Sequence, residues 1–422
     1  MRTLTSYLLG AWQPAGAPSA TLVNPATEEP LAGVAPANDL AKAMAYGRDV
    51  GGPALRALSF KSRGELLSAL SKVLYAHREE LLDLATVSGG CTRGDAKFDV
   101  DGAMGVLAAY AQLAEELGER PWILDDEPAS VFRTSKVRVQ HVSLPRQGLA
   151  IHINAFNFPA WGMVGKAAVA LLAGMPVLTK PATSTCLLAH RIAEIIVDAK
   201  ILPEGAFQFL AGSARDLLDH VGPQDVIAFT GSAATGAKIR GHQAVLANNV
   251  RVNIEADSLN AVILGPDLDP GTELFDLAIR DAHTEITQKT GQKCTATRRI
   301  LVPEAILSVV REALVERLSR TAGLTGDPSI KGVKMGPLAS AQQLADAREG
   351  IQRLASEAKI ILGDPKREDF KRSAEGKGFF IEPVLLEADP ETALRPGAAF
   401  HRLEVFAPVA TLLPYDGSIG AA

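Results

Sequence analysis

A cysteine in an expected turn is the first residue that could do chemistry. Cys294 lies within the sequence GQKCTA (291–296), where a glycine interrupts a helical pattern and would leave the thiol exposed. A thiolate is a strong nucleophile when backbone donors or a nearby cation favour its charged form, and Lys293 would be such a cation. Taken alone, a cysteine is more often a buried structural residue, which is our interpretation of Cys91 and Cys186.

Two further segments place polar side chains where a strand should end. Residues 250–255 alternate as a strand does and end on Glu255, which could serve there as a general base, although a single glutamate is more often merely solvated. Residues 149–153 form a short apolar run, and Asn154 and Asn157 follow it. Either amide could stabilise a developing oxyanion, but capping of the next helix is a strong competing explanation.

A glycine turn follows another expected strand. Residues 226–229 run into Gly231 and Ser232, and a helical pattern that contains Gly236 comes next. Glycine allows backbone amides to approach a phosphate closely, and the N-terminus of a helix favours the anion. Because the spacing is not GxGxxG, the turn alone is weak evidence for a phosphate site.

These candidates are carried by alternating helices and strands. Helical periodicity covers residues 61–118, and a ribbon-like alternation begins at Arg138. Beyond it, short apolar runs alternate with helical stretches, which predicts a parallel sheet with helices on its faces. The expected strands are 149–153, 176–179, 207–211, 226–229 and 250–255, with helices at 159–174 and 184–200 between the first of them. A second α/β region follows from residue 261, with helices near 272–290 and 304–320.

Composition narrows the classes of function. The chain has 422 residues, of which 47% are hydrophobic and 22% charged, and its net charge of −5 is too small to indicate a nucleic-acid or membrane partner. Its three cysteines form neither a disulfide framework nor a metal-ligand cluster, and it has no secretion signal or long apolar span. We therefore expect a soluble cytoplasmic protein whose ligand is a small molecule.

Taken together and in this order, the motifs resemble those of the aldehyde dehydrogenase superfamily, over residues 5–414. Separate motifs seldom recur in one order by chance, so the agreement weakens the purely structural explanation of each residue. The family-like elements are FNFP (156–159), TKPA (179–182), FTGS (229–232), Glu255, GQKC (291–294), MGPL (335–338) and EVFAPV (404–409). In the last of these, Ala407 replaces the glycine that is usual in the family.

The resemblance implies a reaction and a set of site residues. The Cys294 thiolate would attack an aldehyde, while the Asn157 amide and the Cys294 backbone N–H hold the oxyanion. A bound nicotinamide dinucleotide would accept the hydride, and Glu255 would activate the water that releases the acid. The implied cofactor-binding residues are Lys180, Thr183, Gly212, Gly231, Ser232, Glu404 and Phe406, and no metal site is expected.

The resemblance also implies the fold class and the domains. We expect an α/β protein with a Rossmann-like NAD(P)-binding domain built from residues 1–122 and 147–256, and an α/β catalytic domain at 257–422 that is incomplete at its C-terminal end. Residues 123–146 resemble the family's bridging β-hairpin, which pairs subunits. A homodimer is therefore expected.

Departures from the usual family pattern narrow the substrate. Residues 256–260 read ADSLN where most relatives carry an LGGK-like run, and Cys294 follows Glu255 by 39 positions, which is more than usual. Together with the run FNFPAWGM (156–163), these features resemble the branch that oxidises semialdehydes attached to coenzyme A, and we expect the 3,4-dehydroadipyl-CoA semialdehyde of the benzoate pathway. Alternatives are 3-oxo-5,6-dehydrosuberyl-CoA semialdehyde from the phenylacetate pathway, a CoA-acylating reaction, and a non-catalytic binding relative. Gly165 stands where many relatives carry a bulky aromatic residue that lines the substrate funnel, and a wider funnel would suit a long CoA-linked substrate. Close helix packing would explain Gly165 equally well.

The resemblance finally bears on the choice of cofactor. Thr183 stands three residues after Lys180, where NAD-preferring relatives often carry a glutamate. Without that carboxylate, a 2′-phosphate meets no like charge and could gain a hydroxyl donor. We therefore expect NADP, with NAD as the alternative, although Thr183 could also cap the following helix.

Overall fold

The computed structural model describes residues 1–131, 137–374, 376–418 and 420. By its contacts the chain divides into two compact units. The first unit comprises Met1–Leu22, Leu31–Leu82 and Lys97–Ala256, and the second comprises Val23–Pro30, Asp83–Ala96 and Asp257–Ala422.

Two short segments from the N-terminal half are grouped with the second unit, whereas the sequence analysis placed all of residues 1–122 in the first domain. Hydrogen bonds explain the grouping. The Phe379 N–H donates to the Pro25 carbonyl over 2.9 Å, and the Lys289 N–H donates to the Asp95 carboxylate over 3.0 Å. Such long-range bonds leave no periodic signal in a sequence.

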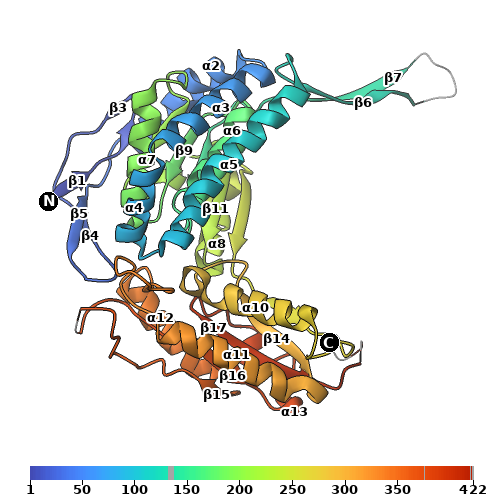
Figure 1. Cartoon of the computed structure of the whole chain (residues 1–422). Coiled ribbons are helices and arrows are strands. Elements are labelled where there is room, and N and C mark those ends of the chain that lie inside the picture. The colour runs from blue at the N-terminus through green and yellow to red at the C-terminus, as the bar shows by residue number, and fades with distance from the viewer. Residues whose placement is uncertain (132–136, 375, 419, 421–422) are drawn as a thin grey trace. The chain divides into compact units, whose positions relative to one another are not determined.

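A seven-stranded sheet forms the centre of the first unit (Figure 1). Its order is β12-β11-β8-β9-β10-β2-β3; the first five strands are parallel, and the two short N-terminal strands are antiparallel. The inner strands are almost wholly buried, as expected for parallel strands covered on both faces. The bounds are β12 (Arg251–Ala256), β11 (Val226–Gly231), β8 (Ala150–Ile153), β9 (Val177–Lys180), β10 (Phe207–Phe209), β2 (Tyr7–Leu8) and β3 (Ala11–Trp12).

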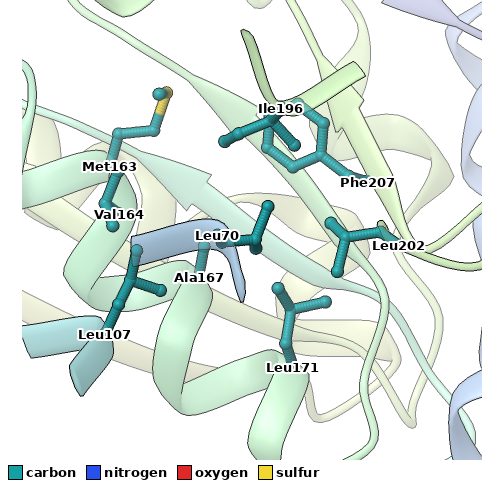
Figure 2. Close-up of a pocket in the computed structure, with 9 residues that line it drawn as sticks. All are labelled: Leu70, Leu107, Met163, Val164, Ala167, Leu171, Ile196, Leu202 and Phe207. Carbon is teal, nitrogen blue, oxygen red and sulfur yellow. The ribbon is translucent and has the colours of Figure 1, made fainter. Parts of the chain in front are cut away.

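Helices α3 (Phe60–Ala76), α5 (Arg93–Leu117), α6 (Trp161–Leu172) and α7 (Cys186–Ala199) contribute side chains to an apolar core of the first unit. Figure 2 shows nine side chains around a small cavity in this core, and all nine are apolar. Because no polar or charged side chain lines it, the cavity is a packing feature and not a place for catalysis. The chemistry-bearing residues of this unit lie elsewhere, at strand ends.

The remaining elements are shorter or lie beside this core. A β-hairpin is formed by β6 (Ile123–Ser130) and β7 (Arg138–Ser143), which pair antiparallel, and every residue of β7 is exposed. A three-stranded sheet has the order β1-β5-β4. The bounds are β1 (Arg2–Leu4), β4 (Ala20–Val23), β5 (Pro30–Val34), α1 (Leu40–Tyr46), α2 (Gly52–Arg56), α4 (Arg78–Gly89), α8 (Ala233–Arg240) and α9 (Gln243–Ala247).

The second unit contains a five-stranded sheet with the order β13-β14-β17-β16-β15, parallel except for β15. Alternate residues of its strands enter two different apolar clusters, so both faces of the sheet are covered. Helices α10 (Glu273–Thr287) and α11 (Leu307–Ala322) belong to one cluster, and α12 (Ala341–Leu354) to the other. The other bounds are β13 (Asn260–Ile263), β14 (Thr297–Pro303), β15 (Lys359–Leu362), β16 (Val384–Glu387), α13 (Pro390–Ala393) and β17 (Val409–Tyr415).

Among the described residues, no helix is long and apolar enough to cross a membrane. In the same part of the chain, no three His, Cys, Asp or Glu side chains come together in a way that could hold a metal ion.

Candidate active site

Glu255 is the penultimate residue of β12, at the carboxyl end of the first unit's sheet. It pairs in register with Thr230 of β11, and its side chain is exposed. Parallel strands end at one edge of their sheet, so the Glu255 carboxylate lies beside the residues at the ends of the neighbouring strands. Because it is exposed, a water molecule can reach it, as a general base requires.

Lys166 of α6 contacts the strand ends, and no motif in the sequence predicts its role. Its ammonium donates to Asn154 Oδ1 over 2.9 Å and to Thr230 Oγ1 over 2.7 Å. Burial lowers the pKa of Lys166 to about 8, and the Glu255 carboxylate opposes that shift. One signal could have found it, because Lys166 is the single charged residue of an otherwise apolar helix, WGMVGKAAVALL.

The two asparagines after β8 have different roles in the structure. Asn154 is buried and bonded on both sides, since it accepts from Lys166 and donates to Thr179 Oγ1 over 2.9 Å. Asn154 does not cap α6, because its amide is bonded elsewhere and the Asp99 carboxylate accepts from the first backbone N–H groups of that helix, Ala160 at 3.2 Å and Trp161 at 2.8 Å. Asn157 is half-buried in the loop between β8 and α6.

The expected cofactor residues of the first unit lie at the same edge of its sheet. Lys180 ends β9, and burial lowers its pKa. Gly212 follows β10 with a φ of 75°, in the left-handed region that favours glycine. Gly231 ends β11, and Ser232 is the N-cap of α8, where its hydroxyl accepts from the Thr235 N–H. A parallel sheet typically binds a dinucleotide in this crevice.

Thr183 begins a short 3-10 helix next to Lys180 and is half-buried. The residues at the N-cap positions of this helix and of α7 are Ala182 and Thr185, and neither makes a side-chain cap. The capping role considered for Thr183 is therefore not its role in the structure.

The candidate nucleophile lies in the second unit, in a loop that begins with an unusual turn. Helix α10 ends at Thr287, and Lys289, Thr290 and Gly291 then all have left-handed φ values of 52°, 57° and 66°. Only glycine fits at 291, because a Cβ there would lie 2.3 Å from the Ala407 carbonyl oxygen. The turn delivers Cys294 to the surface, where its side chain is exposed.

The surroundings of Cys294 differ from those expected. Lys293 is buried, and its ammonium is committed to Glu285 at 2.9 Å and Gln288 at 2.8 Å, so it is not the cation expected beside the thiol. Asn260 instead reaches the loop, since its amide donates to the Cys294 carbonyl over 2.7 Å and to the Ala296 carbonyl over 3.1 Å. The backbone after the nucleophile is thus anchored.

Glu404 presents a half-buried carboxylate in the second unit. One oxygen, Oε2, accepts from the Ser258 N–H over 3.0 Å, while Oε1 is buried and has no hydrogen-bond partner. Burial raises the pKa of Glu404, against the effect of Ser258 and of Arg298. A buried carboxylate oxygen that accepts no hydrogen bond needs a donor, and a hydroxyl-bearing ligand such as a ribose would supply one. Phe406 lies nearby and is half-buried, with the Arg298 guanidinium 5.6 Å from its ring centre.

The expected site residues therefore fall into two groups. The first unit carries Asn157, Glu255 and the phosphate-side residues, and the second carries Cys294, Glu404 and Phe406. Within each unit they lie on loops and strand ends next to a parallel sheet. Three further residues that no motif predicted contact these segments. Lys166 bonds to the strand ends of the first unit, Asn260 bonds to the nucleophile loop, and Arg298 lies beside Glu404 and Phe406.

Comparison with known proteins identifies the family. The model of the aldehyde dehydrogenase family matches residues 12–420. The chain is 44% identical over 414 residues to a 3,4-dehydroadipyl-CoA semialdehyde dehydrogenase of Aromatoleum evansii, covering 98% of this chain and 79% of the relative. It is 30% identical to an α-ketoglutaric semialdehyde dehydrogenase of Bacillus subtilis, covering 86% and 70%.

A solved structure agrees with the sequence relatives. A mutant of aldehyde dehydrogenase C from Pseudomonas syringae, in complex with NAD+ and octanal, superimposes with a TM-score of 0.85 at 25% identity, over 99% of this chain and 81% of that one. The α/β fold class expected from the sequence is thereby confirmed. The chain belongs to the aldehyde dehydrogenase family, with the mixed α/β fold and the NAD(P)-dependent aldehyde-oxidising activity of that family.

Proposed function

We propose that this protein oxidises a semialdehyde carried on a coenzyme A thioester to the carboxylic acid, with 3,4-dehydroadipyl-CoA semialdehyde as the substrate. The observation that carries the proposal is the 44% identity to the Aromatoleum evansii enzyme over 98% of this chain, well above the 30% found with the α-ketoglutaric semialdehyde enzyme. The departures at residues 256–260 support it, because Ser258 and Asn260 of that segment contact Glu404 and the nucleophile loop.

Cys294 is the proposed nucleophile. Its exposed thiolate attacks the aldehyde carbon, the carbonyl π electrons move to oxygen, and the Asn157 amide and the Cys294 N–H stabilise that oxyanion. The nicotinamide dinucleotide, when bound, supplies the hydride acceptor. Oxidation leaves the acyl group as a thioester on Cys294.

Glu255 is the proposed base for the second half of the reaction. It takes a proton from a water molecule that attacks the thioester, and the acid and the free thiol are released. Lys166 lies close enough to Glu255 for their charges to interact, and its pKa of about 8 allows it to gain or lose a proton near neutral pH. The Lys166 charge therefore attracts the Glu255 carboxylate, while the hydrogen bonds of its ammonium go to Asn154 and Thr230.

The cofactor proposed is NADP. Lys180, Thr183, Gly212, Gly231 and Ser232 would hold its adenosine and phosphate end. Glu404 and Phe406 would hold the nicotinamide ribose and ring, with Glu404 Oε1, which accepts no hydrogen bond, accepting one from a ribose hydroxyl. Thr183 supports NADP over NAD, because its side chain is neutral and makes no helix cap.

The decisive experiment is a substrate and cofactor panel. The full chain should reduce NADP faster than NAD, and should oxidise the C6 semialdehyde on CoA faster than the phenylacetate-pathway C8 analogue or octanal, as read from the absorbance of the reduced nicotinamide. Mass spectrometry should find a free acid without added CoA. A requirement for free CoA would indicate an acylating enzyme, and cofactor binding without turnover would indicate a binding relative.

We also propose that the chain forms a homodimer through the β6–β7 hairpin. Val139 and Val142 of β7 are 46% and 48% exposed. A ribbon of two strands cannot cover its own apolar side chains, so these valines are available to a second chain. Light scattering should give a dimer mass, and replacement of both valines by Lys should shift it toward the monomer. A dimer that persists unchanged in that variant would contradict the proposal.

Gly165 of α6 bears on the proposed CoA-linked substrate, because a glycine at this position could widen the substrate funnel. A Cβ added to Gly165 would lie 3.3 Å from the Trp161 ring, so this glycine allows the indole to pack against its own helix. Packing thus accounts for Gly165 without a widened funnel. Specificity for the CoA thioester rests on the sequence relationship and not on this residue.

A further inference from the structure

Arg298 is a charged residue in the interior of the second unit. It lies on β14, and only 5% of its surface is exposed. Its guanidinium donates to backbone carbonyls: Nη1 to Ala407 over 2.6 Å, and Nη2 to Gly291 over 2.7 Å and to Lys293 over 3.4 Å. One side chain therefore joins the nucleophile loop to the segment that carries Glu404 and Phe406.

The Lys293 carbonyl matters most, because it belongs to the same peptide group as the Cys294 N–H. A peptide group is planar, so an arginine that fixes the carbonyl also fixes the direction of that N–H. The peptide on the other side of Cys294 is held by the Asn260 amide at 2.7 Å. Both peptide planes that flank the nucleophile are thus oriented by side chains of the second unit.

Glu404 competes for the same guanidinium. Its Oε1 lies 3.9 Å from Arg298 Nη2, too far for a hydrogen bond, and both Oε1 and Arg298 Nε are buried without hydrogen-bond partners. A buried carboxylate and a buried guanidinium attract strongly unless other groups satisfy them. Arg298 bonds to carbonyls instead, which leaves Glu404 Oε1 available to a ligand.

We infer that Arg298 is a positioning residue that orients the Cys294 N–H toward the oxyanion and keeps this donor in register with Glu404. The inference rests on the proposed function, because it takes Cys294 as the nucleophile and Glu404 as a cofactor contact. Arg298 touches neither substrate nor cofactor in this scheme. It acts through the peptide group before Cys294 and through the segment 404–407.

The adjacent arginine provides a matched control. Arg299 follows on β14, is half-buried, and bonds to the Leu259 carbonyl and to His401 Nδ1. Successive side chains of a strand point to opposite faces, so the two arginines share a strand but serve different surroundings. Arg299→Met removes a comparable charge without removing a bond to the nucleophile loop.

The experiment compares Arg298→Met, Arg298→Lys and Arg299→Met in the full chain, alone and combined with Glu404→Gln. Active sites are counted by alkylation of Cys294 with iodoacetamide, so that kcat refers to folded protein, and NADPH affinity is measured by nicotinamide fluorescence. Arg298→Met should lower kcat per site roughly 10²-fold, as loss of an oxyanion donor does. Arg298→Lys should recover part of it, since an ammonium can bond to one or two carbonyls but lacks the fork.

The coupling to Glu404 has its own readout, which does not depend on turnover. Arg298→Met and Glu404→Gln should each raise the NADPH dissociation constant. The double variant should raise it roughly tenfold less than the product of the two single effects, as for residues in one network. In the control cycle, the effect of Arg299→Met combined with Glu404→Gln should equal the product of their single effects. If Arg298→Met does not fold, Arg298→Lys takes its place in the same cycle.

Two results would overturn the inference. One is a multiplicative cycle for Arg298 and Glu404, and the other is an Arg298 variant that only lowers the number of titratable Cys294 sites while kcat per site is unchanged. If the wild type binds NADPH and oxidises the substrate in either case, this inference alone fails. A wild type that neither binds cofactor nor turns over would remove the proposed function as well.

Discussion

Lys166 in the first unit and Arg298 in the second are two buried cations that donate to different kinds of oxygen. Lys166 contacts side-chain oxygens of Asn154 and Thr230, and its pKa falls to about 8. Arg298 contacts three backbone carbonyls and, although burial lowers its pKa to about 10, it remains charged at neutral pH. The difference shows two uses of buried positive charge, since the lysine can exchange a proton while the arginine can only hold geometry.

The largest expected effect comes from removing the nucleophile, which sets the baseline for both cations. Cys294→Ala should lower kcat by roughly 10⁴-fold or more, because the other two cysteines are buried or half-buried and cannot replace it. NADPH binding, followed by nicotinamide fluorescence, should be retained. An alanine variant that still oxidises the substrate would contradict the assignment of Cys294 as nucleophile, on which the roles of both cations depend.

Lys166 should act on thioester hydrolysis and not on attack. Lys166→Met should slow acid release roughly 10²-fold, because Glu255 loses a neighbouring cation, and the acyl-enzyme should accumulate in intact-protein mass spectra. Lys166→Arg keeps the charge but not the exchangeable proton. If it is as fast as the wild type across the pH range, the distinction between the two cations collapses.

The same lysine should make stability depend on pH. Its pKa is 10.5 ordinarily and about 8 in the folded protein, so between these values the unfolded chain binds more protons and stability rises with pH. The rise should be roughly 1–3 kcal/mol. Urea unfolding at pH 8, 9 and 10 should show it in the wild type and not in Lys166→Met, whereas parallel curves for the two proteins would argue against a depressed pKa.

A change remote from both cations should have a smaller and different effect. Thr183→Glu should raise the KM for NADP roughly tenfold, because a carboxylate repels the 2′-phosphate, while the KM for NAD changes less. Thr183→Ser, which retains the hydroxyl, is the control. Equal changes for the two cofactors would indicate that Thr183 does not face the 2′-phosphate.

The sequence predicted the five parallel strands of the first unit's sheet closely, because each is a short apolar or alternating run with clear ends, but it did not predict the short strands β2 and β3. The run expected at 149–153 is β8 (Ala150–Ile153), and that at 250–255 is β12 (Arg251–Ala256). The helix expected at 272–290 ends instead at Thr287. The left-handed turn after it depends on tertiary bonds, such as that from Thr290 to the Gly336 carbonyl, which periodicity does not detect.

The candidate site was predictable where residues belong to motifs and not where they support them. Lys166 stood out only as a charge in an apolar helix, and nothing in the pair Arg298–Arg299 tells which arginine faces the loop. Lys293 was expected beside the thiol, but its partner Glu285 lies two turns back on α10. The tip of the expected ribbon, 132–136, falls outside the described residues.

Trp161, at the first position of α6, is a natural fluorescent reporter near the proposed site. Its ring lies 5.5 Å from Phe98 and 6.1 Å from Phe158, and a Cβ on Gly102 would lie 2.2 Å from it. The chain has three tryptophans, and Trp12 and Trp122 lie elsewhere, beside His190 and Arg120. Replacing those two by Phe would leave a single emitter four residues from Asn157, whose intrinsic fluorescence reports directly on the loop proposed to hold the oxyanion.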